Sequence, residues 1–403
     1  MNVVDRFLKY VSFDTQSDPN STTIPSALKE RKLGEYLEKE LQEIGLDEVY
    51  LDEYGYVYGW LPASDGYEDE EAIGFIAHMD TAPVSSGANV KPRIIKEYDG
   101  SDIPLGNGVI SKVSYFDHLL KYIGQDLIVT DGTTLLGADD KAGIAEIFTA
   151  MEYLIAHPEI KHGRICVGIT PDEEIGRGAD YFNIKKFGAA FAYTVDAGPL
   201  GQVRYDNPNS CRIEVKITGT FVHPGYAKDK LDNAILIANQ FISMLPPAEA
   251  PAHTEKHEGY YHVSNILGKE AEVDMTLLIA EHSMKKFDER KKFIKRIAAY
   301  LNDVHGEGTV ELDFIDRFYN MKEKILPVMY IVDRAKQAFI SCGVEPDLSP
   351  ARGGTDGVRL SYEGLPCPNI SAGEKYAHGV HEFIPIQSME KMVEVIVAIS
   401  RVQ

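Results

Sequence analysis

The sequence is poor in cysteine, has no long apolar run and carries no excess of positive charge, and each absence excludes a class of protein. Its four cysteines show no Cys-x-x-Cys spacing, which argues against a disulfide framework and against a zinc site made of thiolates. No segment is apolar for long enough to span a bilayer, and residues 1–14 lack the apolar core of a signal peptide. We therefore expect a protein of the reducing cytoplasm.

The charge balance is strongly acidic. With 41 basic and 62 acidic residues, the formal net charge is -21. This charge repels phosphate backbones and anionic lipids, so we expect neither a nucleic acid nor a membrane as a partner. The 403 residues, of which 44% are hydrophobic, are enough for about two to three globular domains.

Short, almost continuous apolar runs indicate strands that are covered on both faces, as in a parallel sheet. Such runs occur at 72–77, 165–170 and 189–195. A stretch rich in Ala, Ile and Leu at 142–155 predicts a buried helix, and an earlier amphipathic helix is expected to end at Gly45. Strands that alternate with helices predict an α/β domain whose mixed, mostly parallel sheet is flanked by helices.

A different pattern occupies the middle of the chain. Residues 212–218 and 309–315 alternate apolar and polar side chains, which predicts strands with one face in solvent. Together with a third strand and two helices, they predict an α+β, ferredoxin-like domain of βαββαβ order, with four antiparallel strands and both helices on one face. We expect this domain, residues 208–315, to be inserted into a discontinuous first domain made of residues 1–207 and 316–403.

Histidine and acidic residues gather just after the predicted strands, at the sheet edge where ligands of α/β proteins bind. The clusters are His78–Asp80, Asp139–Asp140, Asp172–Glu174, Asp196 and His378–Glu382. Each cluster alone has an ordinary explanation, such as a hydrogen-bonded histidine, a helix N-cap or a solvated acidic loop. Together they offer imidazole and carboxylate but no thiolate, which favours zinc over magnesium or calcium. Charge balance favours two ions over one.

Six ordered motifs carry a resemblance to a known family. They are HMD at 78–80, GADDKAG at 137–143, TPDEEIG at 170–176, YTVD at 193–196, RGGTDG at 352–357 and HGVHEF at 378–383. The set resembles the peptidase T family, the aminotripeptidase branch of the two-zinc amidohydrolases, and the likeness runs along the whole chain. It implies an enzyme with two Zn2+ per chain that releases the N-terminal residue of a small peptide substrate, a tripeptide. It also implies that the inserted domain is a lid, through which the chain can form a homodimer.

The resemblance also implies which residues hold the metal. Asp139 is expected to bridge both zinc ions. His78 and Asp196 would complete one site, and Glu174 and His378 would complete the other.

Two further carboxylates have catalytic roles by the same resemblance. Glu173 is the expected general base, and Asp80 is the carboxylate that orients His78. Two zinc ions lower the pKa of a shared water toward about 7, so that hydroxide can attack the peptide carbonyl while Glu173 takes the proton and returns it to the leaving amine. Because adjacent residues of an extended chain point in opposite directions, we expect Glu174 to face the metal and Glu173 the substrate.

Two basic residues are candidates for binding the substrate. His223 matches a lid histidine that reaches over the active site in relatives, and Arg352 is a candidate anchor for a carboxylate, since guanidinium pairs with carboxylate through two hydrogen bonds. Ala280 stands where relatives commonly carry an Arg that helps to bind the substrate carboxylate. Two alternatives stay open: a related two-zinc amidohydrolase that acts on dipeptides or N-acyl amino acids, and a non-catalytic binding protein on the same scaffold.

Overall fold

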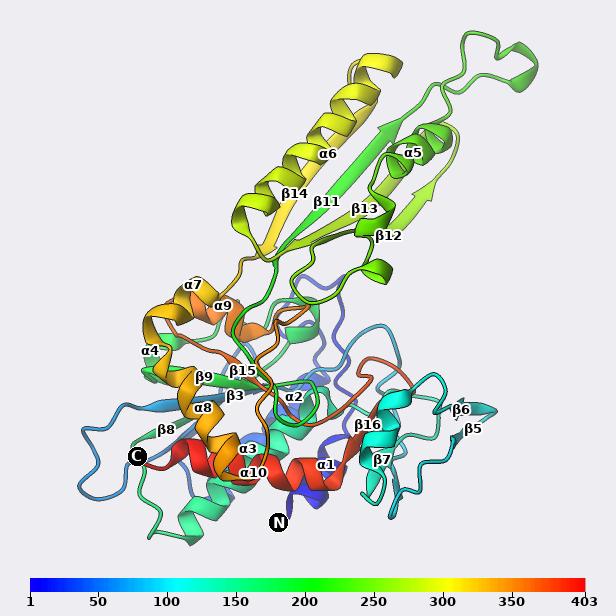
Figure 1. The fold of residues 1–403 in the computed structure, drawn as a ribbon. Coiled ribbons are helices and arrows are strands. Elements are labelled where there is room, and N and C mark those ends of the chain that lie inside the picture. The colour runs from blue at the N-terminus through cyan, green and yellow to red at the C-terminus, as the bar shows by residue number, and fades with distance from the viewer. Residues whose placement is uncertain (403) are drawn as a thin grey trace. The chain divides into compact units, whose positions relative to one another are not determined.

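The chain folds into two compact units (Figure 1), and the computed structural model describes residues 1–402. The first unit comprises residues 1–205, 323–349 and the described residues from 355 onward, and the second comprises residues 206–322 and 350–354. The long segment of the second unit extends beyond the expected insertion of 208–315 at both ends.

A mixed sheet forms the centre of the first unit. Its strands are β1 (Asp47–Leu51), β2 (Val57–Leu61), β3 (Ile73–His78), β8 (Ile165–Thr170), β9 (Phe191–Val195), β10 (Val203–Arg204) and β15 (Asn369–Ile370). Their order across the sheet is β1-β2-β8-β3-β9-β15-β10. Neighbours from β8 to β15 pair in parallel, whereas the outer pairs at both edges are antiparallel. The predicted mixed, mostly parallel sheet is confirmed.

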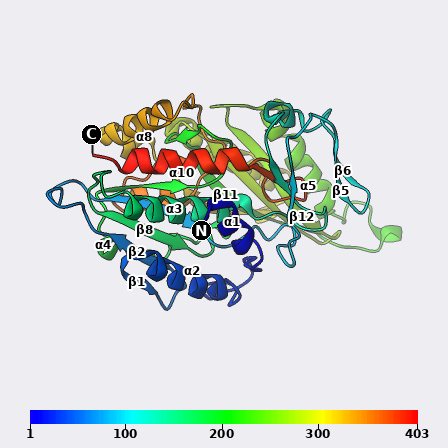
Figure 2. The same cartoon turned by 90° about the horizontal axis from the view of Figure 1, so that it is seen from below.

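Helices cover both faces of this sheet, which is why every residue of β3, β8 and β9 is buried. The helices are α1 (Val3–Tyr10), α2 (Glu30–Ile44), α3 (Ala138–Ala156), α4 (Ile184–Phe187), α7 (Lys322–Ile325), α8 (Tyr330–Ser341), α9 (Asp356–Tyr362) and α10 (Ile386–Ser400). The helices α1, α3 and α10 lie on one face, where α3 and α10 are side by side in Figure 2, and α4 and α9 lie on the other (Figure 1). Helix α2 ends at Gly45 with a positive φ of 104°, as predicted.

Short strands between β3 and α3 form smaller sheets that the sequence patterns did not reveal. Strand β7 (Leu127–Val129) pairs with β4 (Arg93–Ile95) and β16 (Phe383–Pro385), and β5 (Ile103–Gly106) pairs with β6 (Val109–Ser111). Strand β16 follows the loop of His378, so its pairing with β7 fixes the end of that loop.

The second unit has the predicted ferredoxin-like order. Its elements are β11 (Asn209–Thr218), α5 (Ala234–Ser243), β12 (Tyr260–Gly268), β13 (Glu272–Glu281), α6 (Met284–His305) and β14 (Val310–Phe318). The sheet has the order β12-β13-β11-β14 and is antiparallel throughout. Alternate residues of β11 are buried against α5 and α6, while the residues between them face solvent.

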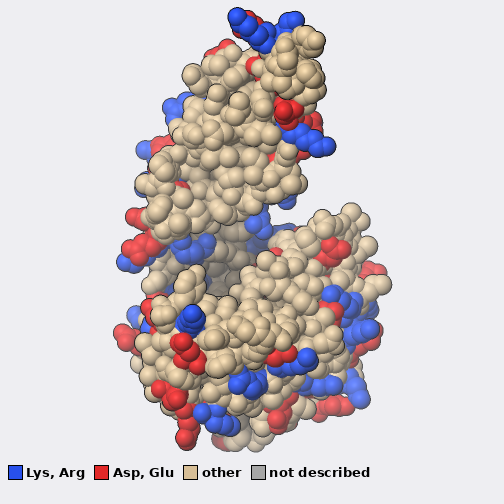
Figure 3. All heavy atoms as spheres, turned by 90° about the vertical axis from the view of Figure 1, so that its right-hand side faces the viewer, with Lys and Arg blue, Asp and Glu red and all other residues tan. Residues whose placement is uncertain are grey.

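The acidic excess is not gathered into one patch on the face that Figure 3 presents. In its lower part, basic and acidic side chains of the first unit are interspersed. Among the described residues, no helix combines the length and the apolar character that crossing a bilayer requires.

Candidate metal centre

The predicted metal ligands lie at the carboxyl edge of the central sheet of the first unit. His78 is the last residue of β3, Asp196 follows β9 directly, and Glu174 lies in a turn after β8. Asp139 lies at the start of α3, and His378 lies in the loop before β16. Parallel strands end at the same edge, so this topology brings together residues that are far apart in sequence, such as Asp139 and His378, which are 239 positions apart.

Asp139 lies between the two histidines. Its Oδ1 is 2.9 Å from Nε2 of His78, and its Oδ2 is 3.0 Å from Nε2 of His378. Nε2 of His378 also lies 3.1 Å from Oε2 of Glu174, and Nε2 of His78 lies 3.7 Å from Oδ1 of Asp196. The structure therefore brings all five predicted ligands together, with Asp139 in the shared position.

Asp140 points elsewhere, although it is adjacent in sequence. Its Oδ2 accepts a hydrogen bond of 3.2 Å from the backbone N–H of His78. The Asp139–Asp140 peptide bond is cis, and both residues depart from helical φ and ψ at the start of α3. Asp140, His78 and Asp196 also present donor atoms within 4.8 Å of one another, so Asp140 borders the same site.

Asp80 joins the first histidine to the acidic turn. Its Oδ1 lies 3.3 Å from Nδ1 of His78, as expected for a carboxylate that orients this ring. The two oxygens of Asp80 also accept hydrogen bonds from the backbone N–H groups of Glu173, at 2.9 Å, and Glu174, at 3.2 Å. A single buried carboxylate thus positions the histidine and the turn that carries both glutamates.

The expected basis for separating Glu173 from Glu174 is wrong. These residues lie in a 3-10 helix, Glu173–Ile175, and not in an extended segment with alternating side chains. Asp172 precedes it with a φ of 59°, in the left-handed region, so the chain turns as soon as β8 ends. The directions of the two side chains are set by this turn and by Asp80.

Glu382 has a positioning role that the sequence analysis missed. Its buried carboxylate accepts hydrogen bonds from the backbone N–H groups of four consecutive residues, Leu136 to Asp139, at 2.7 to 3.1 Å. These are donors at the start of α3, where a helix leaves its N–H groups without partners. Burial raises the pKa of Glu382 to about 7. The HGVHEF motif contained this residue, but nothing in the pattern identified its partners.

Negative charge exceeds positive charge in the site. Burial raises the pKa of Glu173, Glu174 and Asp196. Burial acts in the same direction on Asp139, but hydrogen bonds from the two histidines outweigh it and lower the pKa of this carboxyl group. The hydrogen bonds from His378 to Asp139 and Glu174 raise the pKa of His378 to about 11.

This donor set fits divalent metal ions. Two imidazoles and several carboxylates converge, and Oδ1 of Asp140 and Oε1 of Glu174 are buried without a hydrogen-bond partner among residues 1–402. Metal ions neutralise such an excess of buried carboxylate and occupy unpaired oxygen atoms. The mixture of nitrogen and oxygen donors without thiolate is that of zinc and other borderline metals.

The two predicted substrate-binding residues belong to the second unit. His223 is exposed on the loop between β11 and α5, where its Nδ1 accepts a hydrogen bond of 3.1 Å from the backbone N–H of Gly225. Arg352 is half-buried and donates hydrogen bonds to the carbonyl groups of Lys256, at 3.1 Å, and Glu258, at 2.5 Å. In this structure Arg352 therefore supports the loop before β12.

Comparisons with known proteins identify the family. Residues 131–401 match Peptidase family M20/M25/M40. The chain is 51% identical over 399 residues to peptidase T of Clostridium acetobutylicum, covering 98% of each chain. It is 53% identical over 399 residues to peptidase T of Caldanaerobacter subterraneus subsp. tengcongensis, covering 98% of this chain and 97% of the relative. The chain belongs to peptidase family M20/M25/M40.

Solved structures agree with this membership. The aminopeptidase PepT from Bacillus cereus superposes with a TM-score of 0.76 at 25% sequence identity, covering 99% of this chain and 97% of that chain. A tripeptidase from Staphylococcus aureus has the same fold, with a TM-score of 0.78 at 23% identity over 99% and 97% of the two chains. The resemblance drawn from the six motifs is therefore confirmed.

Proposed function

We propose that this member of the family is a metal-dependent aminopeptidase that removes the N-terminal residue from tripeptides. The observation that carries the proposal is the convergence of His78, Asp139, Glu174, Asp196 and His378 on one sheet edge. Its support from relatives is the identity of 51% and 53%, over nearly the full length, to proteins named peptidase T. A small peptide is accordingly the proposed substrate.

We further propose that the site holds two Zn2+ ions. His78 and Asp196 would hold one ion, Glu174 and His378 the other, and Asp139 would contact both, in keeping with its position between the two histidines. When bound, such ions polarise the peptide carbonyl and lower the pKa of a water molecule toward about 7.

Glu173 is the proposed general base. Its backbone is held by Asp80 beside the metal ligand Glu174, and burial raises the pKa of its carboxyl group. A carboxylate with a raised pKa can take a proton from the attacking water and return it to the departing amine. Asp80 does not exchange protons in this scheme, because it fixes His78 and the turn through its hydrogen bonds.

The second unit is proposed as a lid domain that also supplies a homodimer contact. His223 is exposed on a loop of this unit, next to the exposed aromatic side chains of Phe221 and Tyr226. An exposed imidazole can donate a hydrogen bond to a substrate carbonyl or carboxylate. Arg352 remains the candidate anchor for the substrate carboxylate. Sedimentation analysis tests the dimer, and a monomer at all protein concentrations would exclude it.

The test of the activity is a comparison of substrates by the amino acids that they release. Zinc-loaded protein is incubated separately with a tripeptide, with the dipeptide lacking its C-terminal residue, and with the N-acetylated form of its N-terminal amino acid. We expect the free N-terminal residue from the tripeptide alone. Turnover of dipeptides or N-acyl amino acids without tripeptides would favour the related amidohydrolase, and no turnover of any of them would favour a binding protein.

A further inference from the structure

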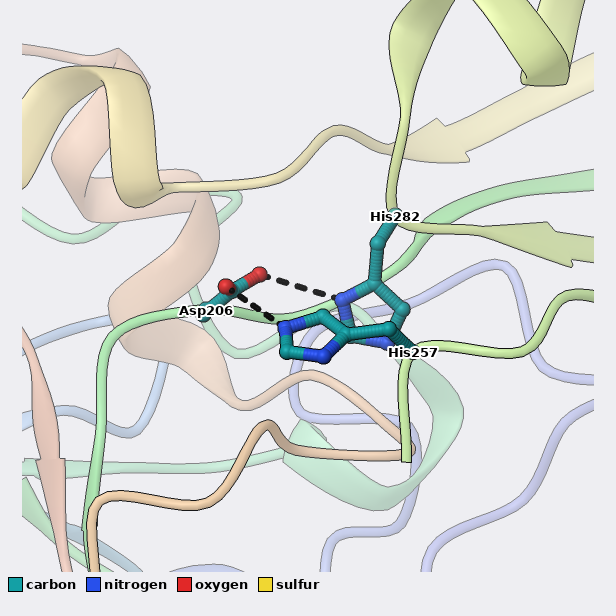
Figure 4. Close-up of side chains that lie close together, drawn as sticks. All are labelled: Asp206, His257 and His282. Atoms are coloured by element: carbon teal, nitrogen blue, oxygen red, sulfur yellow. Dashed lines mark hydrogen bonds and ion pairs between the residues drawn. The ribbon is translucent and has the colours of Figure 1, made fainter. Parts of the chain in front are cut away.

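A second group of metal-ligand side chains lies in the second unit, and it shares no residue with the centre described above. Asp206, His257 and His282 present one donor atom each within 4.8 Å of one another. They come from three separate segments: Asp206 precedes β11, His257 lies in the loop before β12, and His282 follows β13 (Figure 4).

Both imidazoles are aimed at the same carboxylate. Nδ1 of His282 lies 3.1 Å from Oδ1 of Asp206, and Nε2 of His257 lies 3.0 Å from Oδ2. Figure 4 shows the two rings on one side of Asp206, and their planes are inclined by 70°. Neighbouring donors around a four-coordinate zinc ion lie roughly 3.3 Å apart, given metal–ligand distances of about 2.0 to 2.2 Å. Small side-chain movements would therefore let one ion replace the protons between these groups.

The cluster is closed on one side and open on the other. The side chains of Asp206 and His282 are 9% and 7% exposed, whereas that of His257 is 58% exposed. Nε2 of His282 is buried and has no hydrogen-bond partner among the described residues, so the contact of Nδ1 with Asp206 is what orients this ring. A metal ion could reach the open side, where water can supply a fourth ligand.

The surrounding residues hold the three groups in place. Asn320 and Lys322 donate hydrogen bonds of 2.8 Å to the two oxygens of Asp206, which fixes the plane of the carboxylate. Asn209 donates to the backbone carbonyl of His282 at 3.2 Å. Partners of this kind orient the ligands of metal sites, and a carboxylate has lone pairs enough for an ion as well as for two hydrogen bonds.

The exposed histidine is also held, through its backbone. Arg352 donates hydrogen bonds to the carbonyl groups of Lys256 and Glu258, the neighbours of His257, and to Oγ1 of Thr254 at 2.9 Å. Its guanidinium group lies 5.1 Å from the ring centre of Tyr260, at the start of β12. Because the loop is held at these points, His257 loses less conformational entropy when it binds a metal together with Asp206 than it would on an unrestrained loop.

We propose that Asp206, His257 and His282 form a site in the second unit that binds one divalent transition metal ion, Zn2+ in the first place. Two imidazoles and one carboxylate are a ligand set of zinc, and the absence of thiolates separates this site from a zinc finger. The bound ion links three segments of the second unit, so it stabilises this unit against unfolding.

The test is the number of zinc ions bound by the full chain at saturation. Metal-free protein is dialysed against Zn2+ and its content is measured by elemental analysis. We expect His257→Gln and His282→Gln each to bind one ion fewer per chain than the unchanged protein, or to bind that ion at least about 100-fold more weakly. His262→Gln is the matched control, because His262 is an exposed histidine on β12 outside the cluster.

Two further measurements separate this site from the first. Co2+ bound by His282→Gln should lack part of the visible absorption of the unchanged protein, and Zn2+ should raise the unfolding temperature of His257→Gln less than that of His262→Gln. If the first centre binds no metal, the loss of one ion in the two variants remains measurable. Equal zinc content in the unchanged protein and both variants would overturn the proposal, and the cluster would be a hydrogen-bonded network only.

Discussion

The sheets of the two units bring side chains together in different ways. In the first unit, β8, β3 and β9 are parallel, so the residues that follow them meet at one edge. In the second unit the strands are antiparallel, and Asn209 at the start of β11 pairs with Glu281 at the end of β13. At one end of that sheet, the first residues of some strands therefore lie beside the last residues of others.

This difference decides what a sequence can reveal. The ligands at the parallel edge mostly follow apolar runs, so their positions share a signal that can be recognised before the fold is known. In the second unit, Asp206 precedes β11, His257 precedes β12 and His282 follows β13. Nothing in their spacing connects them, and only the antiparallel register does so.

The largest expected effect concerns the chemistry at the parallel edge. Glu173→Ala removes the proposed base and should lower kcat by at least about 100-fold, while the bound metal is retained. The measurement is the rate of amino acid release together with the zinc content. Glu390→Ala is the control, because Glu390 is an exposed glutamate on α10. Retained turnover in Glu173→Ala would contradict the assignment.

The next effect concerns the support of the metal ligands. Glu382→Gln leaves one oxygen to accept from four N–H groups and brings an NH2 group against the others, so the start of α3 and Asp139 should lose their position. We expect zinc affinity in the first unit to fall by about 10- to 100-fold. Titration with Zn2+ and a competing chelator measures it. An affinity equal to that of Glu390→Gln would show that Glu382 does not position the ligand.

A third prediction compares the two sheets directly. A Cβ atom at Gly74 on β3 would lie 2.5 Å from Phe187, on the helix α4 that covers this face, and 2.8 Å from Ala192, its partner on the neighbouring strand β9. Gly74→Ala should therefore lower the free energy of unfolding by about 1 to 3 kcal/mol. Lys216→Ala on the exposed face of β11 should change it by less than about 0.5 kcal/mol. Denaturant unfolding measures both, and equal effects would contradict the comparison.

The smallest expected effect is a pH dependence of the free energy of unfolding, which arises from an ion pair at the β10 edge of the first sheet. Burial opposes ionisation of Asp347, but the hydrogen bonds that its carboxylate accepts from Arg204 on β10 and from Ser349 lower the pKa of Asp347 to about 2. Since the unfolded pKa is about 3.9, the stabilisation is present above that pH and is lost as pH falls toward 2. The pair is partly exposed, so Asp347→Asn should cost about 1 kcal/mol or less at pH 7. The difference between the two proteins in the free energy of unfolding should shrink as pH falls from about 4 through 2 and vanish only below that, and a constant difference would exclude this cause.

Much of the first unit could be predicted because its strands are buried on both faces. The runs at 72–77, 165–170 and 189–195 became β3, β8 and β9 within two residues. Strand β12 was not located, because nearly all of its residues lie on the surface and its pattern does not alternate. The strands from β4 to β7 are too short to produce a period.

The five predicted ligands lie together in the structure, but of the groups that hold them in place only Asp80 was predicted. The motifs and the family resemblance gave the five predicted ligands, three of which follow apolar runs of the sequence: His78, Glu174 and Asp196. The hydrogen bonds of Glu382 and Asp80 depend on turns that the sequence patterns do not encode, such as the left-handed conformation of Asp172. The extended-chain argument for Glu173 and Glu174 was wrong for the same reason.

The contacts of His378 and Glu382 with the start of α3 span 239 to 246 positions of the sequence. During synthesis, a chain that has been made as far as Asp196, just after β9, already contains four of the five predicted ligands, but it lacks His378 and the carboxylate of Glu382 that accepts hydrogen bonds at the start of α3. A ribosome-bound fragment of this kind cannot complete the metal centre. Hydrolytic activity would therefore appear only after residue 382 has left the ribosome, near the end of translation.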